Sequence, residues 1–106
     1  MSQDHVSIVQ SFNRLTPAEH ERLSVLMEEM GEAIQAIGKV FRHGYETTHP
    51  DGGPTNRDML ENELGDVRYA MIAICEAGDL SKAKIHDWAD IKRHTIGRWL
   101  HHQELP

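Results

Sequence analysis

The chain has 106 residues, of which 39% are hydrophobic and 26% charged, and its formal net charge at pH 7 is −6. These values exclude an intrinsically disordered chain and leave room for one small domain with a single core. The acidic balance argues against binding along a nucleic-acid backbone, which requires a basic surface. We therefore expect one domain over residues 1–106 with no nucleic-acid partner.

The cysteine content and the hydropathy pattern indicate where the protein works. Cys75 is the only cysteine, so the chain has no intramolecular disulfide, as is typical of a reducing compartment, and we interpret this residue as part of the core. The N-terminal segment has neither a basic n-region nor an apolar h-region, and no apolar stretch approaches the roughly 20 residues that span a bilayer. The sequence predicts a cytoplasmic protein with no membrane partner.

A long helix is predicted over about residues 16–43. Thr16 is placed to be the N-cap, Pro17 occupies the first helical position and Glu19 completes a capping box. Apolar residues then recur in alternating steps of three and four, which indicates one buried face. This face comprises Leu23, Leu26, Met30, Ala33, Ile37 and Phe41.

Residues 44–54 form the one long loop that we expect, because Gly, Pro and Asp gather there without periodicity. Thr55 then has the character of an N-cap, with Asp58 in the first turn of a second helix that runs to about residue 78. Its apolar face repeats the spacing of the first and comprises Leu60, Leu64, Val67, Met71 and Ile74.

A third helix is predicted over about residues 81–102, capped by Asp79 or Ser81, and a short leading helix over 4–13. Trp88 and Trp99 belong to the third helix's apolar face, and we interpret them as core or interface residues. No segment shows strand-like alternation. We therefore expect an all-α bundle of three to four helices. Because three to four helices in so small a domain give a thin core, we expect a homodimer or homotetramer to complete it.

Two pairs of carboxylates interrupt side stripes on the first two helices. Glu29 and Glu32 form one pair and Glu63 and Asp66 the other, each spaced i, i+3 and therefore on one helix face. Small or apolar residues share these faces: Val25, Ala36 and Val40 on the first helix, and Met59, Ala70, Ala73 and Ala77 on the second. An antiparallel hairpin would bring the two pairs together.

Four ionised carboxylates in one partly buried place repel one another, and a divalent cation would relieve the repulsion. Ligand sets made only of oxygen select hard ions, so we expect Mg²⁺ first and Mn²⁺ as its substitute. By the same helical projection, Glu28 and Glu61 point toward the polar side. The alternative reading treats all these acidic residues as a solvated helix face.

The motif Glu29-x-x-Glu32 followed by Glu63-x-x-Asp66 resembles the signature of the MazG-like all-α nucleoside-triphosphate pyrophosphohydrolases, over about residues 16–100. The resemblance implies that these four residues bind Mg²⁺. It also implies cleavage of a nucleotide substrate between its α and β phosphates, which gives a nucleoside monophosphate and pyrophosphate. Following relatives, we expect Glu32 also to help activate the attacking water.

The basic residues Lys92 and Arg98 are similar to those that the third helix of this family directs at the substrate phosphates. Thr95 stands where the family often has asparagine, so this part of the pattern departs from the family. Lys39 ends the first helix, where a cation suits the helix dipole, and it can also reach a phosphate tail.

Two functions follow from these residues. The first is a pyrophosphohydrolase that cleans the nucleotide pool, with the loop at 44–54 covering the site or selecting the base. The alternative is a non-catalytic helical dimer that binds metal or nucleotide and serves as a regulatory or interaction module.

Overall fold

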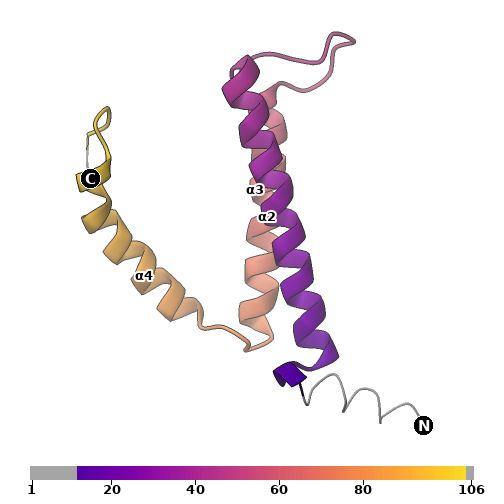
Figure 1. Cartoon of the computed structure of the whole chain (residues 1–106), viewed down its shortest axis with the longest axis vertical. Coiled ribbons are helices and arrows are strands. Elements are labelled where there is room, and N and C mark those ends of the chain that lie inside the picture. Colours follow the sequence, from indigo (N-terminus) through magenta and orange to yellow (C-terminus); the bar gives the residue numbers. More distant parts are fainter. Residues whose placement is uncertain (1–11, 105–106) are drawn as a thin grey trace.

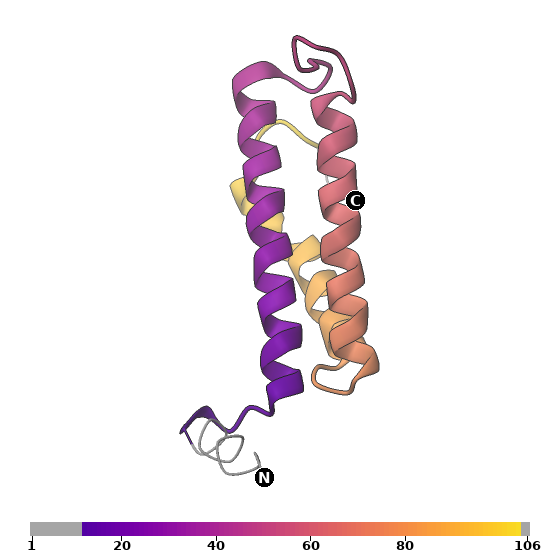
Figure 2. The ribbon, with the colours of Figure 1, turned by 90° about the vertical axis from the view of Figure 1, so that its right-hand side faces the viewer.

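A computed structural model describes residues 12–104. Its main feature is an antiparallel hairpin of two long helices, α2 (Pro17–His43) and α3 (Asn56–Glu76), which lie side by side in both views (Figures 1 and 2). The shorter α4 (Lys82–Thr95) and the 3-10 helix η1 (Ile96–Trp99) follow. Within the described residues there is no strand, only an isolated bridge between Thr48 and Thr55, so the predicted all-α fold class is confirmed. The expected leading helix at 4–13 lies outside the described residues except for its last two positions.

Side-chain caps fix the start of each helix of the hairpin. The Thr16 hydroxyl accepts the Glu19 N–H at 3.1 Å, while the Glu19 carboxylate accepts the Thr16 N–H at 2.7 Å. Thr55 and Asp58 make the same reciprocal pair at 3.1 and 3.2 Å. Each pair satisfies two backbone N–H groups that have no partner inside the helix. Both predicted N-caps of the hairpin are therefore present.

An ion pair joins the two helices at the end of the hairpin opposite the loop. Gly78 adopts a φ of +85°, a conformation that glycine takes without steric cost, and turns the chain out of α3. The next residue, Asp79, accepts Arg22 Nε at 2.6 Å and Nη2 at 3.1 Å. The Arg22 guanidinium thereby holds the pKa of Asp79 below its usual range. Asp79 thus joins α3 to α2, and it is Ser81 that caps α4, accepting the Lys84 N–H.

The two helices of the hairpin meet along small side chains. The buried apolar residues are Ala33 and Ala36 on α2 and Ala70 and Ile74 on α3. Of the apolar face predicted for α2, Ala33 is buried, but most of the larger side chains are exposed, with Met30 at 44% and Phe41 at 86%. Alanine allows two helix backbones to approach closely. The contact combines Ala33 and Ile74 of the two predicted apolar faces with Ala36 and Ala70 of the stripes that carry the carboxylates.

Helix α4 leaves the hairpin at the turn after α3 and lies apart from it (Figure 1). It ends at Thr95 and continues as η1 to Trp99, so the expected single helix to about residue 102 is wrong in its last part. Trp88 and Trp99 are 69% and 71% exposed, which contradicts a place in the core of this chain. Cys75 is only half-buried and lines a cavity of about 320 Å³ between α3 and the start of α4.

The chain on its own is open. It exposes 8819 Å², against about 6,000 Å² for a compact monomer of its mass. Its radius of gyration is 18.6 Å, against about 13 Å for a compact chain of this length. A single copy therefore supplies a hairpin and a separate helix, and the predicted completion of the bundle by a second copy stays a prediction. No helix among the described residues is long and apolar enough to cross a membrane.

Candidate metal centre

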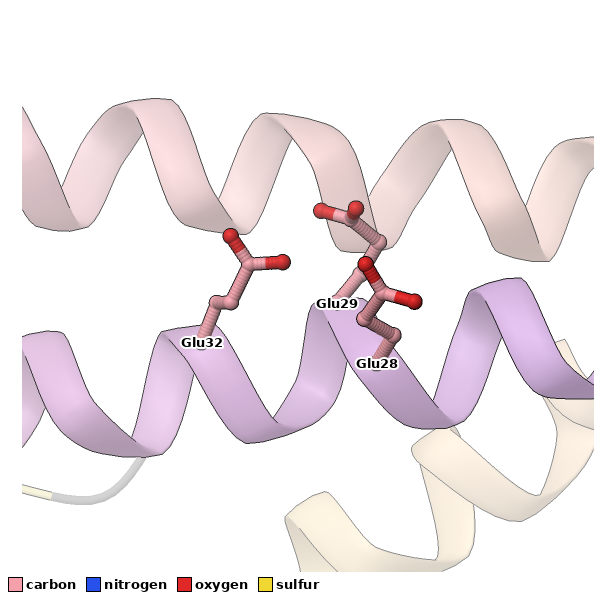
Figure 3. Close-up of side chains that lie close together, drawn as sticks. All are labelled: Glu28, Glu29 and Glu32. Atoms are coloured by element: carbon pink, nitrogen blue, oxygen red, sulfur yellow. The ribbon is translucent and has the colours of Figure 1, made fainter.

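Glu29 lies between the acidic residues of α2 and those of α3. It lies on α2, half-buried, with its side chain directed at α3 (Figure 3). Carboxylate oxygens of Glu29, Glu63 and Asp66 all lie within 4.8 Å of one another. The hairpin therefore brings together three of the four predicted ligands, one from α2 and two from α3.

Glu32, the fourth predicted ligand, lies one turn farther along α2 and also points toward α3 (Figure 3). Its carboxylate lies within 4.8 Å of those of Glu28 and Glu29. Glu32 and Glu63 also line one small cavity of about 90 Å³ between the two helices. Glu29 and Glu63 are half-buried, whereas Glu32 and Asp66 are exposed, so the site is open to solvent at these two residues.

Glu28 was predicted to point away, and the structure contradicts that prediction. Its exposed side chain bends toward Glu29, as Figure 3 shows, and its carboxylate joins the Glu29 and Glu32 group. A helical projection fixes only the direction of Cβ, and three rotatable bonds let a glutamate carboxylate reach the neighbouring sector. The acidic site therefore contains a fifth carboxylate at its rim.

The negative charges of these carboxylates repel one another. Burial raises the pKa of Glu29, and the charges of Glu32, Asp66 and Glu63 raise it further. The Oε2 atoms of Glu29 and Glu63 are buried and accept no hydrogen bond from any described residue. No ion pair of residues 12–104 involves these carboxylates. Unsatisfied buried oxygens are uncommon in folded proteins, so this pair calls for a positive ligand.

A divalent cation satisfies these requirements. The donor set consists of carboxylate oxygens, the ligands that hard ions such as Mg²⁺ and Mn²⁺ prefer. The two buried oxygens come from opposite helices, Glu29 on α2 and Glu63 on α3, and have no competing donor among the described residues. The alternative of a solvated acidic face does not fit Glu29 and Glu63, because both are half-buried. The residues present therefore fit a metal.

The three predicted substrate-binding cations are placed differently. Lys39 lines the small cavity together with Glu32 and Glu63, on the hairpin itself. Lys92 and Arg98 lie on α4 and η1, apart from the hairpin (Figure 1), and do not line the cavities beside the carboxylates. The structure of one copy thus brings Lys39 to the acidic site and leaves the other two away from it.

Three residues that were not predicted as site residues also line the small cavity beside the carboxylates. Asn56 and Met59 line the small cavity from α3, and Gln35 lines it from α2. The signal was available in the spacing, since Asn56, Met59 and Glu63 recur at steps of three and four on one helix face.

The comparison with protein families settles which group of proteins this arrangement belongs to. The model of the MazG nucleotide pyrophosphohydrolase domain matches residues 18–95. The chain belongs to the MazG family. The matched stretch takes in nearly all of α2, the loop, α3 and α4, so the resemblance seen in the carboxylate motif is confirmed over most of the chain. No curated protein and no solved structure matches the chain.

Proposed function

We propose that this MazG domain is a Mg²⁺-dependent nucleoside-triphosphate pyrophosphohydrolase that cleaves its substrate between the α and β phosphates. The observation that carries the proposal is the carboxylate cluster between α2 and α3, with two buried oxygens that no described residue satisfies. House-cleaning of the nucleotide pool in the cytoplasm is the role that this activity would serve.

Glu29, Glu32, Glu63 and Asp66 would hold the metal, with Mn²⁺ as a substitute. When bound, the metal supplies positive charge that offsets the carboxylates and the substrate phosphates. Glu32 is exposed and lines the small cavity, so it can accept the proton of a water molecule. The water oxygen then forms a bond to the α phosphorus as the bond to the bridging oxygen breaks, and pyrophosphate leaves.

Lys39 is placed to bind a substrate phosphate from the same cavity. We propose that Lys92 and Arg98 contribute to the phosphate site in a homodimer or homotetramer, where α4 packs against a second copy. The large exposed side chains of α4 and η1, including Trp88 at 69% and Trp99 at 71%, support such packing. So does the excess of exposed surface over that of a compact monomer.

The test is pyrophosphate release from a panel of standard and modified (d)NTPs with Mg²⁺ or Mn²⁺. We expect metal-dependent release that is lost in Glu63→Gln, because this substitution removes a charge and a buried ligand oxygen. Glu61→Gln, two residues away on α3 and exposed, is the matched control and should leave release unchanged. No release from any nucleotide by the native chain would refute the proposal.

A second candidate, a module that binds metal or nucleotide without cleaving it, is favoured by one observation. Lys92 and Arg98, the cations expected at the phosphates, lie apart from the carboxylates in a single copy. If it is correct, a nucleotide binds in the presence of Mg²⁺ and is recovered intact after long incubation. Calorimetry and chromatography of the same sample distinguish this outcome from hydrolysis.

A further inference from the structure

A cavity lies at the loop end of the hairpin, opposite the turn that leads to α4. Its volume is about 560 Å³, within the range of about 300–1,000 Å³ that is usual for small-molecule sites. We call it the loop pocket. Its walls come from the last turns of α2, the loop and the first turns of α3, through residues that include Lys39, His43, Thr48, Pro50, Asn56 and Met59.

The loop pocket continues into the acidic site. Lys39, Asn56 and Met59 line both the loop pocket and the small cavity that Glu32 and Glu63 share. Along α2, the seven residues from Glu32 to Lys39 rise about 10 Å. A ligand with one end at the carboxylates therefore has a path of two helical turns into the loop pocket, which suits a molecule of nucleotide length.

The pocket is held open by hydrogen bonds between the two sides of the loop. The Asn56 N–H donates to the Thr47 carbonyl and the Arg57 N–H to the Tyr45 carbonyl, both at 2.9 Å. The Asn56 side-chain amide donates to the Gly44 carbonyl at 3.0 Å. Arg57 also lies over the Tyr45 ring, 4.4 Å from its centroid. A wall braced in this way costs little ordering when a ligand binds.

The lining has the character of a nucleoside site. Pro50, Pro54 and Met59 offer apolar surface against which a flat base can pack. Asn56 uses its amide N–H on Gly44, which leaves its Oδ1 as a hydrogen-bond acceptor. Phosphates need charge and donors but no apolar wall, so the apolar part of the lining favours a base and sugar over a phosphate tail.

We propose that the loop pocket binds the nucleoside half of the substrate, so that the α phosphate lies at the carboxylates and the base under residues 47–54. This inference rests on the proposed function and adds to it the direction in which the substrate lies. It also makes the loop the segment that determines which base the protein accepts.

The experiment fills the loop pocket with a large side chain and compares the two reaction products, the nucleoside monophosphate and pyrophosphate, as inhibitors. Thr48 is exposed and lines the pocket, so Thr48→Trp occupies it without burying the new side chain in a core. Glu61→Trp, on the exposed side of α3, is the control for adding a tryptophan. His49→Trp fills the same pocket from the neighbouring residue and replaces Thr48→Trp where that variant does not fold. Binding of Mn²⁺ alone reports an intact acidic site.

We expect Thr48→Trp to raise the inhibition constant of the monophosphate product at least tenfold. The inhibition constant of pyrophosphate and the affinity for Mn²⁺ should stay within twofold of those of Glu61→Trp. Weaker inhibition by pyrophosphate with unchanged inhibition by the monophosphate would overturn the proposal, because the pocket would then hold the phosphate tail. Unchanged inhibition by both would overturn it as well. A native chain that releases no pyrophosphate refutes the proposed function instead.

Discussion

The substitution Glu29→Gln separates the two effects of the acidic cluster, the repulsion among its carboxylates and its affinity for a cation. Two groups of three neighbouring carboxylates occur among the described residues, one with Glu28 and Glu32 and one with Glu63 and Asp66. Glu29 is the only residue that belongs to both groups. Its raised pKa means that the folded state binds a proton more readily than the unfolded state does. Stability of the metal-free protein should therefore rise as the pH falls through this raised pKa, and glutamine should abolish that part of the rise.

When metal is bound, the charge of Glu29 should stabilise the folded protein instead of destabilising it. A cation at a free concentration of 100 times its dissociation constant stabilises the folded state by about 2.7 kcal/mol. For a domain of this size, each kcal/mol raises the Tm by about 4–8 °C. We therefore expect saturating Mg²⁺ or Mn²⁺ to raise the native Tm by about 10–20 °C. Glu29→Gln should lose most of this shift while its metal-free Tm at pH 7 equals or exceeds that of the native chain.

Thermal unfolding followed by circular dichroism, with chelator and with metal, measures both quantities. Glu61→Gln removes the same charge from an exposed position of α3 and should keep the full metal shift. The reasoning is refuted if Glu29→Gln retains the native shift, because the ion would then be held without the central carboxylate. It is also refuted if the metal-free variant is clearly less stable than the native chain at pH 7.

Three other predictions concern the remaining parts of the molecule. Glu32→Gln should lower kcat by about 100-fold or more, in line with the loss of a general base, and steady-state kinetics at saturating metal would contradict this if kcat were unchanged. Asp79→Asn removes the carboxylate that accepts Arg22. Because the pKa of Asp79 is lowered, the resulting loss of stability should be present at pH 7 and vanish as the pH falls through that lowered pKa. Equal losses in Tm at pH 7 and in strong acid would disprove a stabilising ion pair between Asp79 and Arg22. Trp88→Glu places a charge on the exposed face of α4 and should shift the protein toward the monomer in light scattering, an idea that an unchanged mass would exclude.

Helix starts and the acidic site could be predicted from local rules. The cap at Thr16 depends only on Glu19, three residues away, and the cap at Thr55 depends in the same way on Asp58. The convergence of Glu29 with the α3 carboxylates needed one further assumption, that the two helices form an antiparallel hairpin. That assumption follows from their lengths and the loop between them.

Packing was harder to predict because periodicity does not say which apolar stripe meets which partner. Of the apolar stripe predicted for α2 only Ala33 is fully buried, together with Ala36 of the neighbouring stripe, and Phe41 remains 86% exposed. Hydrophobic periodicity reports that a face will be buried but does not report whether the same chain buries it. The end of α4 at Thr95 is similarly undetermined, since its sequence continues to favour a helical turn through Trp99.

In the proposed metal site, the alanine contact between α2 and α3 would also make the distance between the two helix backbones decide which size of ion fits. Ligands on opposite helices move apart if the helices do, and the side chains at Ala36 and Ala70 set how closely the helices approach. Mg²⁺ needs oxygens at about 2.0–2.1 Å, whereas Ca²⁺ accepts about 2.3–2.6 Å. A single larger residue at Ala70 would therefore widen the proposed metal site without replacing any proposed ligand, and relatives that differ at this position should differ in which cation they prefer.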